Sequence, residues 1–352
     1  MFGISSGFVA QYYGILVNWL THTFGPSVFV APISLIIALL FFAIILSIIF
    51  SVYGYLFGWI ERKLIARMQS RRGPTYVGKF GILQNLADLI KLVSKENIVP
   101  ALADKPVFLT LIPLMLAIFV TVLAFIPLTS DFIGINTGIA LIVVFLALSF
   151  MPLLVFLTGW TSGNKFSSIG AQRSVVMLIS YEIPLIIVIA SIAFLANGYN
   201  LTAIINAQNQ YWFIVLMPIG FVVFFIALLA EIERPPFDLR DADSELIAGW
   251  LTDVSAPYYA LALFIDYVRL FVGSLLVAIL FLGGWLGPSF LPQFAWLIIK
   301  TAIVSLVIIV IRGTTVRMRV DQLLRFGWKY LMPLSIVNLL ITYLLFVSGI
   351  VG

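Results

Sequence analysis

The chain has 352 residues, of which 62% are hydrophobic and only 10% are charged, and its mean hydropathy is +1.15. This composition excludes an ordinary soluble domain, because too few polar residues remain to cover the exterior of one. There are 20 Lys and Arg against 15 Asp and Glu, which gives a formal net charge of +5 and an isoelectric point near 9.4.

Apolar runs of about 20 residues, the length that a hydrocarbon core roughly 30 Å thick requires, recur along the chain. Their length and their lack of strict alternation favour helices over a β-barrel. We predict an all-α integral membrane protein that forms one membrane domain over residues 1–352. The first 30 residues lack a basic start and a small-residue cleavage site, so no signal peptide is predicted. The eight predicted spans are 33–58, 107–128, 138–160, 175–197, 212–231, 256–283, 295–312 and 330–350.

The basic residues are distributed unequally between the two sides of this arrangement. Connectors on one side, with the adjoining helix ends, hold 18 of the 20 Lys and Arg, whereas the opposite connectors hold none. Because short cytoplasmic loops are enriched in Lys and Arg, we predict cytoplasmic charged connectors and termini that face outward. The high isoelectric point therefore reflects topology and gives no support to nucleic-acid binding. The charged connectors are 61–106, 161–174, 232–255 and 313–329.

The first charged connector changes character along its length. Its early part carries five Arg and Lys before Gly73, and from Ile82 on the spacing is that of an amphipathic helix. Leu86, Ile90 and Val93 share the apolar face of this helix. The helix either lies among lipid headgroups or forms a docking platform for a partner protein or an amphiphilic ligand.

Ionisable side chains lie inside three of the predicted spans, where each costs roughly 2.5–3.5 kcal/mol on insertion scales. Asp266 and Arg269 are three residues apart in the sixth span, so they share a helix face and can pair. Lys300 is near the outer end of the seventh span and can extend its amine to the surface. Glu182 has no basic neighbour one turn away, so it is either a buried protonated side chain or part of a proton relay.

The third charged connector is unusually acidic, with seven of the 15 acids lying in or beside it. The adjacent Pro235 and Pro236 stiffen it, and its SELIAGW segment returns to helical spacing. It is either a solvated loop or a stiff scaffold on which neighbouring carboxyl groups couple their titrations. The acids are Glu231, Glu233, Asp238, Asp241, Asp243, Glu245 and Asp253.

The residue types that the chain lacks limit its chemistry. It has no cysteine, so it cannot ligate an iron–sulfur cluster or a thioether-linked haem. His22 is its only histidine, which leaves no histidine pair for a transmembrane haem. No glycine-rich phosphate loop follows a strand, so nucleotide binding is unsupported. If the protein serves redox chemistry, another subunit carries the electrons.

Four blocks of the sequence resemble signature blocks of the NuoH family, which is the membrane subunit at the junction of the two arms of respiratory complex I. The resemblance covers nearly the whole chain in the order of the family. The retained VGKFG is more similar to archaeal complex I relatives than to membrane-bound hydrogenase anchors. The blocks are ERKLIARMQSRRGPTYVGKFGILQNLADLIKLVSKE, GWTSGNKFSSIGAQRSVVMLISYEIPL, AEIERPPFDLRDADSELIAGW and RVDQLLRFGWKYLMPLSIVN.

The resemblance implies a proton-translocating oxidoreductase in the plasma membrane of a prokaryote. A quinone, or a quinone-like carrier, would enter a chamber in this subunit and be reduced by the terminal iron–sulfur cluster of a partner. The implied partners are that peripheral-arm subunit, a hydrogenase-like large subunit, and small and antiporter-like membrane subunits. The implied proton-relay positions are Glu182, Glu231, Glu233, Asp238, Asp241, Asp243, Glu245, Asp253 and Asp266. The positions implied at the chamber or its entrance are Arg62, Arg71, Asp88, Arg234 and Phe237, and no metal site is predicted.

The sequence also departs from the family pattern. Arg240 stands where proline is usual, and Asp241 and Asp243 replace glutamates. DVSAPYYA replaces an EYSG block, which leaves the proton route and the headgroup of the carrier open. The alternatives are the anchor of a membrane-bound hydrogenase, which binds no quinone, a stand-alone secondary cation transporter and a passive scaffold.

Overall fold

In the computed structural model, residues 8–24, 30–130, 132–241 and 243–348 are described, and this part of the chain contains helices and loops but no strand. Within these ranges, seven helices are long and apolar enough to cross a membrane, which confirms the predicted all-α membrane fold. They are α2 (Val30–Met68), α4 (Lys105–Phe125), α5 (Ala140–Thr161), α6 (Lys165–Ala196), α11 (Ala256–Phe281), α12 (Gln293–Thr314) and the continuous run of α13 (Val320–Phe326) and α14 (Met332–Val347). A π-helical turn over Gly327–Leu331 joins α13 to α14.

The prediction of one continuous span over 212–231 is wrong. The segment breaks at Met217 into α8 (Phe213–Leu216) and α9 (Pro218–Glu231). Proline disfavours the helical conformation at the residue before it and cannot donate a backbone hydrogen bond. Met217 accordingly has φ −133° and ψ 66°. The 14 residues of α9 extend only about 21 Å, which is less than a hydrocarbon core requires.

Two of the spanning helices continue well beyond their apolar runs. Helix α2 extends past the predicted boundary at residue 58 to Met68, and α6 begins at Lys165 instead of residue 175. The side-chain oxygen of Asn164 caps α6 by accepting a hydrogen bond from the amide of Phe166. The helical extensions place Glu61 and Arg173 on rigid elements, although the sequence predicted loops there.

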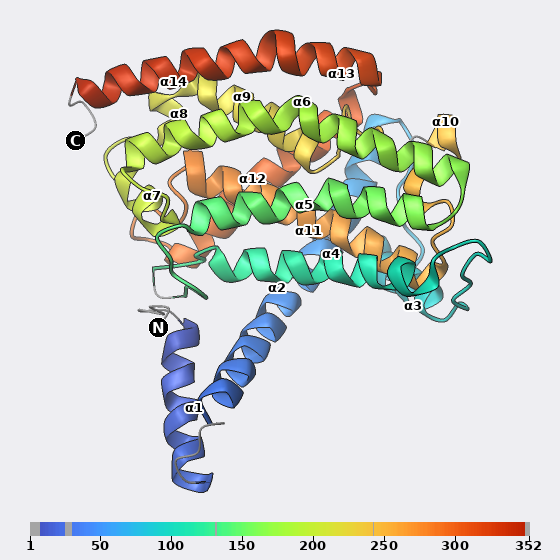
Figure 1. Cartoon of the computed structure of the whole chain (residues 1–352), viewed down its shortest axis with the longest axis horizontal. Coiled ribbons are helices and arrows are strands. Elements are labelled where there is room, and N and C mark those ends of the chain that lie inside the picture. Colours follow the sequence, from blue (N-terminus) through green and yellow to red (C-terminus); the bar gives the residue numbers. More distant parts are fainter. Residues whose placement is uncertain (1–7, 25–29, 131, 242, 349–352) are drawn as a thin grey trace.

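The helix that positions the site is α11, which packs against α2, α4 and α12. Figure 1 shows α4, α5, α6 and α14 running side by side across the molecule. Every residue of α11 from Val268 to Phe281 is buried, so the charged side chain of Arg269 on this helix faces protein and not lipid. Helix α1 (Phe8–Phe24) pairs with the first half of α2, and both extend away from the remaining helices in Figure 1. His22 lies on α1, and its side chain is outside the described residues.

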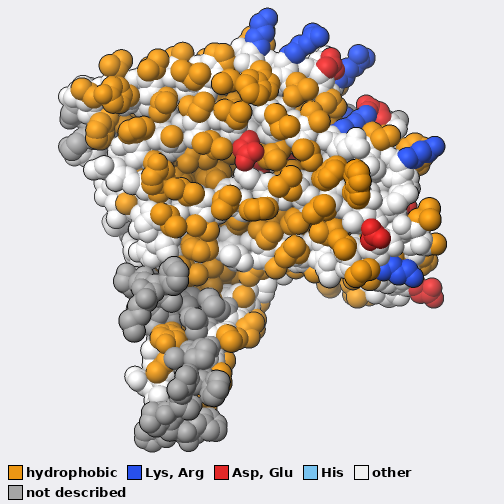
Figure 2. All heavy atoms as spheres, in the orientation of Figure 1, with side chains coloured by type: hydrophobic (Ala, Val, Ile, Leu, Met, Phe, Trp, Pro, Cys, Tyr) orange, Lys and Arg blue, Asp and Glu red, His pale blue; other side chains and the backbone are white. Residues whose placement is uncertain are grey.

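Charged side chains gather at the end of the bundle where α3 (Gln84–Val93), α10 (Asp243–Leu246) and α13 lie, as Figures 1 and 2 show together. Hydrophobic side chains cover most of the face drawn in Figure 2, and an isolated acidic group interrupts them. The predicted amphipathic helix is confirmed as α3, with Leu86, Ile90 and Val93 exposed. The assignment of this end to the cytoplasm stays a prediction.

Candidate functional site

The acidic connector, residues 232–255, is not a solvated loop. Its apolar side chains Phe237, Leu239 and Trp250 are buried, and a cis peptide bond joins Pro235 to Pro236. The hydroxyl of Ser167 on α6 donates a hydrogen bond of 3.1 Å to the carbonyl of Trp250. The connector is therefore folded against the helices and holds its carboxyl groups in fixed places.

Gly249 closes the connector on itself. Its φ is +55°, a left-handed conformation that favours glycine, and a Cβ there would collide with the carbonyl oxygen of Arg240. A Cβ on Gly170 of α6 would lie 2.8 Å from the same oxygen. Two glycines therefore let the backbone of Arg240 approach both the turn and α6.

The substitution Gly249→Ala is expected to destabilise the folded connector by about 1–3 kcal/mol, because it combines a strained φ with the collision at Arg240. Thermal unfolding of the detergent-solubilised protein, followed by tryptophan fluorescence, measures this change. Gly138→Ala is the matched control, since nothing lies within 4 Å of a Cβ built there. Equal midpoints for the two variants would contradict the packing described for Gly249.

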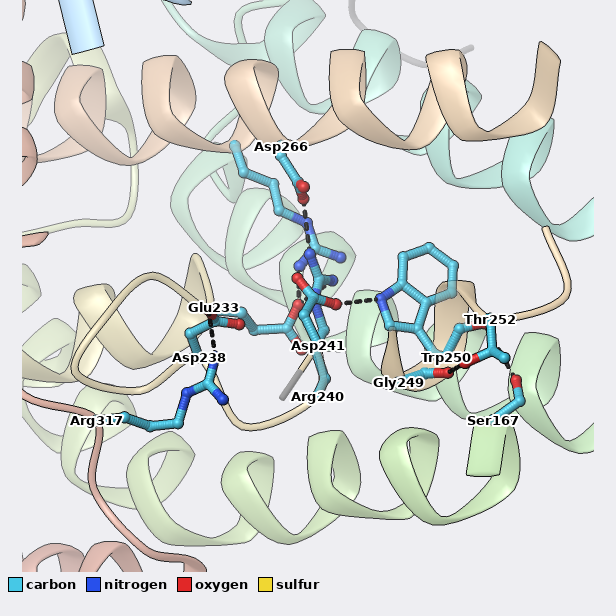
Figure 3. A network of polar contacts seen from close by, with 11 residues as sticks. Ser167, Glu233, Asp238, Arg240, Asp241, Gly249, Trp250, Thr252, Asp266 and Arg317 are labelled. Atoms are coloured by element: carbon cyan, nitrogen blue, oxygen red, sulfur yellow. Dashed lines mark hydrogen bonds and ion pairs between the residues drawn. The ribbon is translucent and has the colours of Figure 1, made fainter. Parts of the chain in front are cut away.

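Glu233 is the centre of a buried ion cluster (Figure 3). Its carboxylate is fully buried and forms ion pairs with the guanidiniums of Arg240 and Arg269. Arg240 also donates to Asp266 at 2.7 Å. Glu233 has φ +54°, a conformation rare for a residue with a side chain, so the turn that aims its carboxylate inward is strained.

The predicted pairing of Asp266 with Arg269 is wrong. Asp266 pairs with Arg240, and Arg269 pairs with Glu233. Both of these α11 residues therefore pair with residues of the acidic connector. Spacing along one helix makes contact between two side chains possible, but buried charges also require partners with good geometry. The connector provides those partners.

A second buried group joins Glu61 of α2 to Arg234 and Arg312. The carboxylate of Glu61 accepts from Arg234 at 2.6 Å and from Arg312, and both Glu61 and Arg234 are buried. Glu61 and Arg312 were not among the site residues predicted from the sequence. The signal that could have indicated Glu61 is its place at the end of an apolar run, before the first basic residue of the connector.

Asp238 and Asp241 complete the charged region. Arg317, which precedes α13, donates to Asp238 at 3.1 Å, and burial raises the pKa of Asp238 while Arg317 opposes that rise. Asp241 accepts from the indole nitrogen of Trp250 at 2.8 Å and lies 3.3 Å from the Arg240 guanidinium. Burial raises the pKa of Asp241 to about 7, against the opposing effect of Arg240.

Glu231 lies close enough to Glu233 and Glu182 to interact with both electrostatically. Glu231 is buried at the end of α9, and its electrostatic neighbours include Tyr181, Arg269, Glu233 and Glu182. Glu231 and Arg269 both line a cavity of about 10 Å³. Glu182 is half-buried on α6 and forms no ion pair with any described residue. Carboxyl groups therefore continue from the ion cluster to a face of α6.

The structure does not bring every predicted acid to this cluster. Glu245 is exposed and pairs with Arg173 at 2.6 Å, which lowers the pKa of its carboxyl. Asp253 accepts from the Asn164 amide at 3.2 Å, away from Glu233. The side chain of Asp243 lies outside the described residues.

An apolar groove of about 460 Å³ opens between α2, α3 and α11. Arg62 and Asp88, joined by a 2.6 Å ion pair, are among its few charged lining residues. A second, polar cavity of about 250 Å³ lies under the acidic connector and is lined by Glu233, Arg234, Asp238, Arg240, Asp241 and Asp266. Leu263 and Tyr267 line both spaces, so the groove adjoins the charged cavity.

Two residues implied at the chamber line neither space. Phe237 is buried in the core of the connector, and Arg71 lines a surface pocket beside Arg62. The prediction that Lys300 extends to the surface is also wrong. Its buried amine donates to the carbonyls of Leu282, Gly284 and Leu286, beyond the end of α11. Carbonyl groups left free at a helix C-terminus attract a cation, which explains why the amine stays inside.

The fold and the site define a multi-pass helical membrane subunit with a buried cluster of paired charges. The family described as NADH dehydrogenase matches residues 24–343. The H subunit of the NADH-quinone oxidoreductase of Bacillus cytotoxicus is 41% identical over 313 residues, which cover 87% of this chain and 94% of the relative. The protein of the same name from Dehalococcoides mccartyi is 41% identical over 307 residues, or 87% of this chain and 86% of the relative. The chain belongs to the NuoH family of membrane subunits of complex I-type NADH-quinone oxidoreductases.

Proposed function

We propose that this subunit binds a quinone, or a quinone-like carrier, in the apolar groove and couples its reduction to proton translocation. The observation that carries the proposal is the junction at Leu263 and Tyr267, where the groove adjoins the charged cavity. A quinone combines an apolar tail with a polar headgroup, and binding sites commonly join an apolar wall to a few convergent polar groups. The groove suits the tail, and the cavity suits the headgroup.

The cavity supplies protons, and a partner supplies electrons. Reduction of a quinone to a quinol takes up a pair of electrons and a pair of protons. This chain has no cysteine to hold an iron–sulfur cluster, so the electrons come from a peripheral-arm subunit, with NADH as the donor that the names of the relatives indicate. Asp241, with its pKa raised to about 7, can both give and regain a proton near neutral pH.

The proposed proton route runs from the cavity through Glu233 and Glu231 to Glu182. The cavity that Glu231 and Arg269 line has about the volume that one water needs. Glu182 is half-buried and has no basic partner among the described residues, so it suits a carboxyl that changes its charge. We place a small or antiporter-like membrane subunit against α6, and the hydrogenase-like large subunit at the charged end, in the plasma membrane of a prokaryote.

Photolabelling of the assembled complex tests the carrier site. A photoreactive ubiquinone analogue should cross-link to residues of α2, α3 and α11 that line the groove, such as Leu86 and Phe264. Excess decylubiquinone should prevent the labelling. Labelling confined to other surfaces, or unaffected by the competitor, would contradict the proposal and favour the anchor of a hydrogenase-type complex.

A further inference from the structure

We propose that Arg240 is a positioning residue for proton transfer: a fixed guanidinium that bridges Glu233 and Asp266 and sets the pH range in which the cavity accepts protons. The inference deepens the proposed function and rests on it. Arg240 was notable in the sequence only as a departure from the family pattern. The structure places it at the centre of the cluster drawn in Figure 3.

The contacts of Arg240 join two acids of its own connector to α11. Its Nη1 pairs with Glu233 from the turn after α9, and its Nη2 lies 2.7 Å from Asp266 on α11. Its Nε lies 3.3 Å from Asp241 of the connector itself. The guanidinium also lies 5.2 Å from the centre of the Trp250 ring, which adds a cation–π contact. A single buried side chain therefore serves three carboxylates.

The side chain is held in place from both ends. Arg240 is only 1% exposed, and the close packing of Gly170 and Gly249 fixes its backbone. Because the guanidinium is buried and fixed, neither solvent nor a mobile ion can take its place beside the carboxylates. It acts as a preorganised charge, which is the arrangement that most strongly stabilises an ionised group inside a protein.

The charges of the ion-paired residues around the cavity are balanced. Five carboxylates face five guanidiniums, so loss of Arg240 would leave an uncompensated negative charge in a buried cavity. The cavity would then take up a proton to restore the balance. The carboxylates are those of Glu61, Glu233, Asp238, Asp241 and Asp266, and the guanidiniums are those of Arg234, Arg240, Arg269, Arg312 and Arg317.

The direction of the resulting pH effect follows from this balance. A carboxyl must be protonated before it can deliver a proton to the carrier, so turnover falls as the pH rises through the range where the cavity ionises. An opposite charge in contact lowers the pKa of a carboxyl by about 1–3 units. Removal of Arg240 therefore moves the alkaline limb of the pH–rate profile to higher pH by about 1–3 units.

The first test compares Arg240→Gln, Arg240→Lys and Arg325→Gln in the assembled complex in native membranes. Arg325 is exposed on α13, so its variant controls for loss of a positive charge at this end. NADH-driven reduction of decylubiquinone is followed across pH. We expect the alkaline limb to move to higher pH in Arg240→Gln only, and to lie at its wild-type position in Arg240→Lys and Arg325→Gln. An unshifted limb in Arg240→Gln would overturn the proposal.

A second measurement separates this inference from the proposed function. Infrared titration of protonated carboxyl groups requires no turnover, and it should show an additional protonated carboxyl at neutral pH in Arg240→Gln but not in Arg240→Lys. If quinone reduction proves independent of this chain, the titration still decides the role of Arg240. If Arg240→Gln does not assemble, the double variant with Asp266→Asn restores the charge balance. It should then assemble and titrate like the wild type, and failure to do so would overturn the proposal.

Discussion

The substitution Leu263→Trp is expected to reduce carrier turnover about a hundred-fold while leaving the subunit assembled, because small displacements of a reacting group have effects of this size. Leu263 is half-buried and lines both the apolar groove and the charged cavity. The larger indole would fill the junction between them and keep a headgroup away from Asp266. The expected loss is therefore mainly in kcat with long-tailed substrates, since the outer part of the groove stays open.

NADH-driven reduction of decylubiquinone by native membranes measures this effect, with immunodetection of the assembled complex in the same samples. Leu340→Trp is the matched control, because Leu340 is exposed on the apolar face of α14. Wild-type turnover in an assembled Leu263→Trp complex would show that the carrier does not pass through the junction between the groove and the cavity.

The substitution Glu61→Gln is expected to destabilise the assembled subunit by about 3–5 kcal/mol, because removal of one partner leaves buried charges uncompensated. Glu61 is 2% exposed, and it is the shared acceptor of Arg234 and Arg312. Neutralisation would leave the Arg234 guanidinium buried beside α11 without its carboxylate partner, and the carbonyl of Asp266 at 3.4 Å supplies no compensating charge.

Glu245→Gln is the matched control for this prediction. The same chemical change there removes an exposed pair with Arg173, and such pairs contribute less than about 1 kcal/mol. The measurement is the yield and the thermal midpoint of the complex after mild detergent extraction. A midpoint for Glu61→Gln as high as that for Glu245→Gln would show that the buried triad contributes little.

The sequence predicted the parts of the fold that depend on local pattern. A span must match the thickness of a bilayer, so most of the apolar runs correspond to helices of the structure. The spacing of Leu86, Ile90 and Val93 was sufficient to predict α3. The break at Met217 could have been predicted as well, because Pro218 lies inside that apolar run. Packing with α6 and α14 then accommodates a helix too short to span.

The charge pairing could not be predicted in the same way. Glu61 meets Arg234 and Arg312 across 173 and 251 positions of the sequence, and no local pattern contains such distances. Arg240 looked like a departure from the family, whereas in the fold it joins two acids of its own connector to Asp266, which lies 26 positions away on α11. The position of Lys300 near a helix end predicted an amine that extends to the surface. The structure instead provides buried carbonyl acceptors for this amine just beyond the end of α11.

The most direct test of the coupling is the number of protons translocated per molecule of decylubiquinone reduced, measured in liposomes that contain the assembled complex. Glu182→Gln is the informative variant, because Glu182 has no ion pair among the described residues. Its neutralisation therefore leaves no described basic side chain without a partner. Asp321→Asn, an exposed acid on α13, is the control. We predict that Glu182→Gln lowers the proton-to-quinone ratio while quinone reduction continues in uncoupled membranes. An unchanged ratio would contradict a proton route through this carboxyl.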